Sequence, residues 1–150
     1  MLTVYIDADA CPVKDETYKV ANRYELTVWV VANQYVQTPR SERIRIQTVR
    51  SGEDAADDWI AEQADKGDIV ITADIPLAAR ALDKGARVLG FKGREFTPDG
   101  IGDALASREL SQQLREIGIQ TGGPAPFTKK DRSQFSNKLD ALVHAIKRGR

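Results

Sequence analysis

Short apolar runs alternate along this chain with stretches of helical character, and this alternation constrains the fold more than any other feature. Residues 2–6, 26–32, 68–72 and 86–91 have the length and the side-chain types of buried strands. The segment 43–49 alternates polar with apolar residues, which is typical of a strand with one open face and predicts an edge strand.

The stretches between the apolar runs predict helices. Their expected ranges are 12–24, 52–66, 75–85, 99–118 and 131–149. Strands that alternate with helices of this length predict an α/β fold, with a mostly parallel sheet of about five strands between two helical layers. There is no internal repeat and no linker, so we expect one domain over the 150 residues.

Composition places the chain among soluble proteins. Hydrophobic residues make up 41% and charged residues 29%, and no apolar run approaches the ~20 residues of a membrane span. The beginning of the sequence lacks the features of a secretory signal, and one cysteine cannot form a disulfide framework. We therefore expect a cytoplasmic protein.

Aspartates gather where the predicted strands end. Asp7 closes the first apolar run, Asp9 follows it, and Asp74 comes just after 68–72. Three further acids occupy the first turns of the helix that Ser51 is expected to cap, namely Asp54, Asp57 and Asp58. Because loops and helix starts meet at the carboxyl ends of parallel strands, we expect these acids to converge at one edge of the sheet.

Buried carboxylates need compensation, because an unpaired buried charge costs several kcal/mol and like charges raise each other's pKa. Mg²⁺ or Mn²⁺ takes oxygen ligands of this kind and leaves positions open for water and phosphate. We therefore expect Asp7 and Asp74 to hold such an ion, together with Asp9 and at least one helical acid. The helical acids also fit a plain solvated face that stabilises the helix dipole.

Cations are unevenly distributed, although Lys plus Arg and Asp plus Glu number 22 each. The segment "TGGPAPFTKKDR" offers backbone amides, cations and an aromatic ring, which suit a phosphate-rich ligand with stacked bases, although a plain loop before a solvated helix explains the same residues. The residues that we expect to contact nucleic acid, most plausibly RNA, are Lys14, Arg50, Arg80, Phe127, Lys129, Lys130 and Arg132.

Longer motifs resemble known families. "IDADACPV", "SGEDAADDWI" and "GDIVITAD" resemble the strand-end and helix acids of PIN-like ribonuclease domains and flap-type 5′ nucleases. Over nearly its whole length, including "DAADDWI", "DIVITADIPLAARAL" and "TGGPAPFTKKDRSQF", the chain resembles the bacterial YaiI/YqxD family, which is regarded as PIN-like.

The resemblance implies a metal-dependent phosphodiesterase. Its catalytic acids would be Asp7, Asp54, Asp58 and Asp74, with Asp9 and Asp57 completing the metal site. Two ions roughly 3.5 to 4 Å apart can activate a water and stabilise the leaving oxygen. PIN-like patterns often carry another acid two residues after the strand-end aspartate, where this chain has Pro76, so the number of ions stays open.

Two other functions fit some of the same residues. A phosphatase of the haloacid-dehalogenase type would use Asp7 as the nucleophile and Asp9 as the acid and base, although Ala10 and Cys11 depart from that pattern. A binding module would hold a metal or nucleic acid without catalysis. Cys11 precedes a helix start, where a thiol can be activated, but a small, semi-buried structural cysteine is the expectation.

Overall fold

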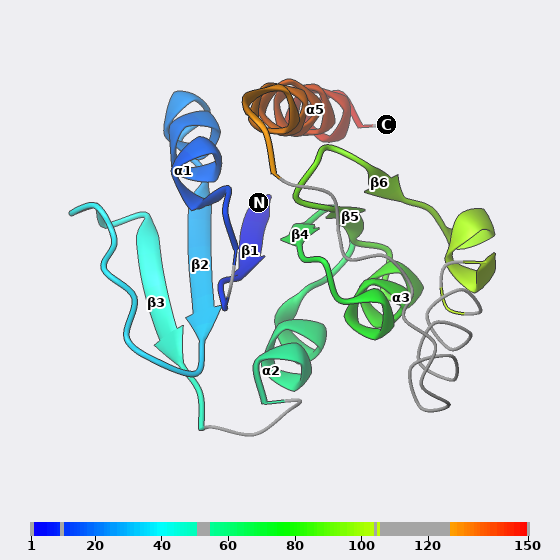
Figure 1. The fold of residues 1–150 in the computed structure, drawn as a ribbon, viewed down its shortest axis with the longest axis horizontal. Coiled ribbons are helices and arrows are strands. Elements are labelled where there is room, and N and C mark those ends of the chain that lie inside the picture. Colours follow the sequence, from blue (N-terminus) through cyan, green and yellow to red (C-terminus); the bar gives the residue numbers. More distant parts are fainter. Residues whose placement is uncertain (1, 10, 51–54, 104, 106–126, 150) are drawn as a thin grey trace.

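A computed structural model of the protein describes residues 2–9, 11–50, 55–103, 105 and 127–149. Its centre is a six-stranded sheet (Figure 1). The strands are β1 (Thr3–Asp7), β2 (Thr27–Ala32), β3 (Ile44–Thr48), β4 (Ile69–Ile71), β5 (Arg87–Leu89) and β6 (Glu95–Phe96).

The strands are arranged in the order β3-β2-β1-β4-β5-β6. All neighbouring pairs are parallel except β5 and β6. The predicted edge position of 43–49 is confirmed, because β3 is at the end of the strand order and, within the described residues, pairs only with β2. Strand β6 was not predicted, since its two residues are too few to show a period of two in the sequence.

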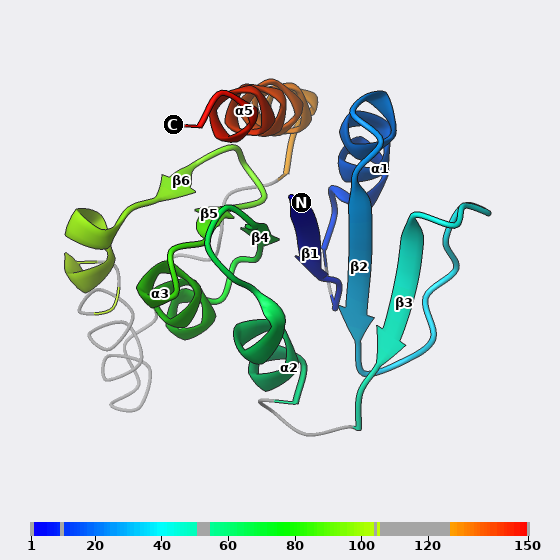
Figure 2. The ribbon, with the colours of Figure 1, turned by 180° about the vertical axis from the view of Figure 1, so that it is seen from behind.

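Helices cover both faces of the sheet, as predicted. They are α1 (Lys14–Arg23), α2 (Ala55–Gln63), α3 (Ile75–Asp83) and α5 (Lys129–Lys147). Figures 1 and 2 show α1 and α5 on one side of the sheet and α2 and α3 on the other. Residues 98–103 are helical, while 106–118 of the predicted helix 99–118 lie outside the described residues. No described helix is long and apolar enough to cross a membrane.

The side chains of β1 alternate between the two cores. Val4 and Ile6 are buried in the core beneath α1 and α5. Tyr5 lies in the core beneath α2 and α3, where its ring meets the ring of Trp59 at 6.1 Å. Since strand side chains alternate, Asp7 belongs to the same face as Tyr5. The first strand therefore delivers its terminal carboxylate to the α2 and α3 side of the sheet.

The starts of α1 and α5 each differ from the predicted starts by two residues. Helix α1 starts at Lys14, two residues later than predicted, after the Val13 carbonyl accepts from Thr17 N. Helix α5 starts two residues earlier than predicted, because Thr128 and Asp131 form a reciprocal capping box. The predicted cap at Ser51 lies outside the described residues.

Candidate functional site

The candidate site lies at the topological switch point of the sheet, where the order of the strands reverses. From β1 the chain adds β2 and β3 on one side and β4 and β5 on the other. Ile6 of β1 pairs with Ile71 of β4, so the carboxyl ends of these two strands lie side by side. Ligands of open α/β sheets bind in the crevice at such a point, because the connecting loops diverge there. Asp7 and Asp74 lie at this switch point, which we call the acidic crevice.

Thr72 joins the two acids. Its side chain is fully buried at the end of β4. Its hydroxyl donates to Asp7 Oδ2 over 2.8 Å and accepts from the backbone N–H of Asp74 over 3.0 Å. Thr72 was not among the predicted site residues, although a threonine that follows an otherwise apolar strand is the signal that would have identified it. Thr72 fixes the Asp7 carboxylate against the loop that carries Asp74.

Asp7 is half-buried, and its surroundings disfavour its negative charge. Burial raises the pKa of the Asp7 carboxyl above its ordinary value, and the charges of Asp74 and Asp9 raise that pKa further. The hydrogen bond from Thr72 acts in the opposite direction. The charge of Asp7 is therefore stabilised less than that of an aspartate in water. A bound cation would stabilise this charge and would therefore bind favourably.

Asp74 has a structural task besides its place at the crevice. It is the N-cap of α3, and its Oδ1 accepts from Leu77 N over 2.9 Å. Among the described residues, the other carboxylate oxygen accepts no hydrogen bond. Capping therefore orients the Asp74 side chain without using all its acceptor capacity.

Asp9 lies toward β2. Both of its carboxylate oxygens accept from Asn33 N, over 3.3 and 3.1 Å. Asn33 follows β2, and its Oδ1 is buried without a hydrogen-bond partner in the described part of the chain. Asp9 is itself exposed. This arrangement does not support a phosphatase that uses Asp7 and Asp9 as a pair. Thr72 holds Asp7 on the β4 side of β1, and Asn33 holds Asp9 on the β2 side.

The predicted helical acids separate into three cases. Asp54 lies outside the described residues. Asp57 is half-buried in the first turn of α2. Asp58 is exposed and pairs with Arg80 of α3, with 2.7 Å between Oδ1 and Nη1. That ion pair joins two of the predicted site residues to each other, so Asp58 and Arg80 partly neutralise one another at the rim.

The described residues contain no group of three or more His, Cys, Asp or Glu side chains arranged to hold a metal ion. Mg²⁺ nevertheless commonly binds through one or two carboxylates, with waters and substrate phosphates as its other ligands. Asp7 and Asp74 provide two such carboxylates. The described donor set therefore fits an open, partly hydrated ion better than a closed structural site.

The predicted basic residues lie around the same edge. Arg132 Nη1 donates to the carbonyl of Pro12 over 2.6 Å, which places the start of α5 beside the start of α1 and Lys14. Its guanidinium carbon lies 4.9 Å from the centre of the Phe127 ring. Phe127 also packs against the core, so its ring is only partly available for stacking.

The remaining predicted cations are exposed. Lys129 and Lys130 begin α5, and Arg50 follows the end of β3 by two residues. Because β3 is parallel to β1, Arg50 also lies at the carboxyl edge of the sheet. The structure therefore places these cations at the same edge of the sheet as Asp7 and Asp74.

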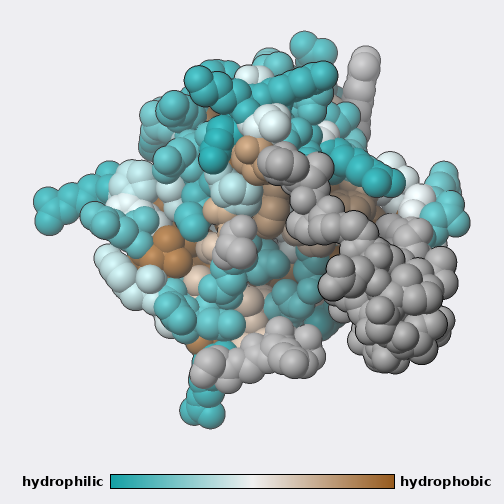
Figure 3. Space-filling view, in the orientation of Figure 1, coloured by the Kyte–Doolittle hydropathy of each residue, from teal (hydrophilic) through white to brown (hydrophobic). Residues whose placement is uncertain are grey.

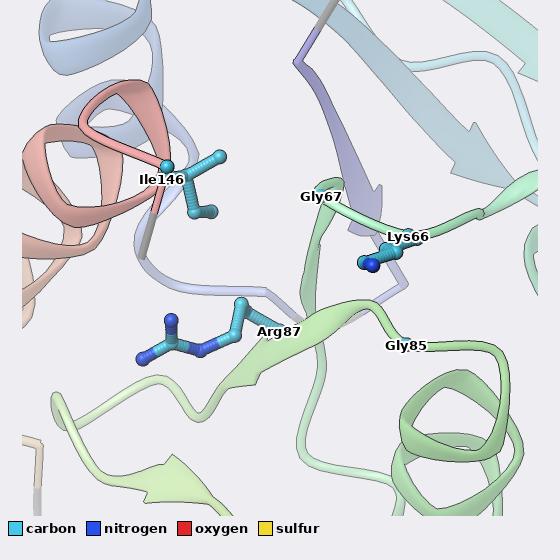
Figure 4. A pocket seen from close by; sticks show the side chains of 6 residues that line it. Lys66, Gly67, Gly85, Arg87 and Ile146 are labelled. Carbon is cyan, nitrogen blue, oxygen red and sulfur yellow. The ribbon is translucent and has the colours of Figure 1, made fainter.

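A separate cavity of about 500 Å³ lies at the opposite ends of the strands. Lys66 and Gly67 precede β4, and Gly85 and Arg87 lie at the start of β5 (Figure 4). Ile146 of α5 closes one side. No acidic side chain lines this cavity within the described residues, so it is not the candidate metal centre.

Cys11 is buried more completely than the semi-buried position that we expected, and we predict that its thiol is unreactive. Burial raises the pKa of the thiol to about 11. At pH 8 very little thiolate forms, so disulfide exchange with an aromatic disulfide reagent should be at least about 100-fold slower than for free cysteine. The rate should reach that of free cysteine only after unfolding in denaturant. A comparable rate in the folded protein would contradict this prediction.

The comparisons with known proteins agree on a family. The family model described as "Uncharacterized BCR, YaiI/YqxD family" matches residues 5–145. A UPF0178 protein of Rhodospirillum centenum is 54% identical over 154 residues and covers both chains completely. UPF0178 proteins of Rhodospirillum rubrum and Paramagnetospirillum magneticum are 54% and 55% identical, over 99% of this chain and 100% and 98% of their own lengths. The chain therefore belongs to the YaiI/YqxD family.

Proposed function

We propose that this protein is a metal-dependent nuclease that acts on RNA or other single-stranded nucleic acid. The observation that carries the proposal is the state of Asp7. Its carboxylate is half-buried at the switch point of a parallel sheet, its pKa is raised, and two further aspartates contribute negative charge to it. A divalent cation is the ligand that would relieve this repulsion.

The proposed roles follow from the contacts. Asp7 and Asp74 would bind Mg²⁺ or Mn²⁺, with Thr72 fixing the geometry between them. Asp9 and Asp57 would orient waters or supply further ligands. The same role is proposed for Asp54, which lies outside the described residues. When bound, the ion would lower the pKa of a coordinated water and stabilise charge on the phosphate oxygens.

The surrounding cations support a phosphate-rich substrate. Lys14, Arg132 and the first turn of α5 lie at the same edge of the sheet as Asp7, and Arg50 follows β3 at that edge. Arg132 Nη1 also lies 3.3 Å from Glu16 Oε1. Contacts of Lys and Arg to phosphates position a nucleic acid without reading its bases. The resemblance of the acidic motifs to PIN-like ribonuclease domains supports the same substrate class.

The test is cleavage of a mixed pool of single-stranded RNA with Mn²⁺ present. We expect the wild-type protein to cleave the pool and Asp74→Asn to be slower by about 100-fold, which corresponds to ~2.7 kcal/mol of transition-state stabilisation. Asparagine is as good an N-cap as aspartate, so α3 should keep its start. The loss would therefore report the missing charge.

Asp83→Asn is the matched control, because Asp83 is exposed at the other end of the same helix. It should cleave at the wild-type rate. Equal cleavage by the Asp74→Asn protein would refute the proposed site. Binding of Mn²⁺ without any cleavage by the wild type would instead support a binding module.

A further inference from the structure

A basic groove lies between the turn that follows β5 and the outer side of α5. It has a volume of about 580 Å³, within the roughly 300 to 1,000 Å³ of ligand sites. Lys92, Gly93 and Arg94 line it from the turn, and Gln134, Asn137 and Lys138 line it from α5. Figure 3 shows a largely hydrophilic surface where Figure 1 draws α5.

Backbone contact holds the two walls of the groove together. Gly93 has a φ of +89°, and a Cβ there would lie 2.8 Å from the backbone carbonyl atoms of Gln134. Only glycine allows this approach. Gly90 N donates to Arg94 O over 2.8 Å and closes the turn. Lys92 and Arg94, on either side of Gly93, are therefore held at fixed positions beside α5.

Lys92, Arg94 and Lys138 line the groove, and two carboxylates offset part of their charge. One is Asp131, whose pKa is lowered by its hydrogen bond from the Thr128 backbone and also by the charge of Lys92. Lys138 Nζ lies 3.7 Å from Glu95 Oε1, but Glu95 Oε2 already accepts from Arg87 Nε at 2.7 Å. The second carboxylate is thus shared by two cations. The exposed amides of Gln134 and Asn137 add uncharged hydrogen-bond donors. Cations interspersed with amide donors are the groups that bind phosphates of a nucleic-acid backbone.

The groove and the acidic crevice lie at the same edge of the sheet. The backbone N–H of Thr72 donates to Leu89 O over 3.2 Å, and the turn begins at the next residue, Gly90. The Thr72 hydroxyl donates to Asp7. Only β4 separates β1 from β5, so roughly 10 Å lies between their axes at normal strand spacing. The groove lies on the α5 side of the sheet, whereas Asp7 belongs to the α2 and α3 side, so an extended chain bound in the groove would cross this edge to reach Asp7.

We propose that this groove binds the phosphodiester backbone of single-stranded nucleic acid and leads it toward the acidic crevice. The choice of nucleic acid as the polyanion rests on the proposed nuclease function. The groove itself is argued from its own charges and contacts.

The test measures binding without cleavage. Fluorescence anisotropy of a labelled RNA of about 12 nucleotides, within the size range of single-strand sites, is recorded in EDTA. We expect the double variant Lys92→Gln and Arg94→Gln to bind at least about 10-fold more weakly. The slope of log affinity against log salt should fall by about 0.7 for each lost phosphate contact. A DNA strand of the same sequence shows whether the sugar matters.

Lys66→Gln is the control, because Lys66 is an exposed cation at the opposite edge of the sheet. It should bind like the wild type, and all variants should melt at the wild-type temperature. Unchanged RNA affinity and an unchanged salt slope in the double variant would contradict the proposal that the groove binds RNA. Displacement of RNA by polyglutamate as effective as by polyphosphate would overturn the nucleic-acid assignment in favour of an acidic peptide.

The two proposals can fail separately. The wild-type protein could bind RNA, lose affinity in the double variant and yet never cleave RNA. This result would reject the nuclease proposal and support the groove proposal. Cleavage could instead depend on Asp74, while the double variant at Lys92 and Arg94 keeps the wild-type RNA affinity and cleavage rate. This result would reject the groove proposal and support the nuclease proposal.

Discussion

An Asp7→Asn variant is expected to lose Mn²⁺ binding and, without metal, to be more stable than the wild type. Burial and the charges of Asp74 and Asp9 disfavour the Asp7 carboxylate, and asparagine removes that charge. The amide oxygen of asparagine can still accept from the Thr72 hydroxyl. We expect a gain on the order of 1 kcal/mol in the free energy of unfolding at pH 7, because functional sites commonly cost stability of this size.

The gain should depend on pH in a defined direction. The pKa of Asp7 is raised in the folded protein, so the folded state holds its proton at pH values where the unfolded chain has lost it. The contribution of Asp7 to stability is therefore fully present below its unfolded pKa of ~3.9 and is lost as the pH rises through its folded pKa. The advantage of the variant should be absent near pH 3 and should grow toward neutral pH.

Added Mn²⁺ should reverse the order of stability. A ligand at 100 times its dissociation constant stabilises the folded state by about 2.7 kcal/mol, and only the wild type should gain this. Thermal melting in EDTA and in Mn²⁺, with calorimetric titration of the metal, measures both effects. Asp83→Asn should behave as the wild type throughout. A variant with unchanged Mn²⁺ affinity would exclude Asp7 from the metal site.

A Phe135→Ala variant is expected to lose about 3 to 5 kcal/mol of stability. Phe135 is the largest fully buried side chain of the core beneath α1 and α5. Its truncation leaves a cavity at the place where the backbone of α5 also contacts Gly93, so the sheet and the turn cannot readily close around it. At about 2 to 4 °C per kcal/mol for a domain of this size, the melting temperature should fall by roughly 6 to 20 °C.

Urea denaturation measures this loss as a lower midpoint with an unchanged slope. The neighbouring residue provides the control, because Gln134 is exposed and Gln134→Ala should stay within about 0.5 kcal/mol of the wild type. A loss below about 1 kcal/mol in Phe135→Ala would mean that other contacts hold α5 on the sheet.

Most of the fold could be predicted because its signals are local. The apolar runs became β1, β2, β4 and β5, and the alternating run became the edge strand β3. Strand β6 and the early start of α5 were not predicted, for two different reasons. The first is too short to show a period, and the second depends on a capping box whose acid is Asp131, where N3 positions favour Glu or Gln.

The candidate site was only partly predictable. The meeting of Asp7 and Asp74 followed from the rule that carboxyl ends of parallel strands share an edge, once β1 and β4 were neighbours. The hydroxyl of Thr72 between them and the pairing of Asp58 with Arg80 join residues from different elements. Contacts of this kind depend on strand order and helix packing, which sequence periodicity does not encode.

The sequence by itself determined the kind of fold and the acids at the strand ends, because periodicity and burial are properties of neighbouring residues. Tertiary structure alone decided how those acids differ. Asp7 is turned toward Thr72 and Asp74, Asp9 is held by Asn33, and Asp58 is neutralised by Arg80. The physical reason is that the free energy of a charged side chain depends on its burial and on its neighbouring groups. Packing between segments that are distant in the sequence determines both.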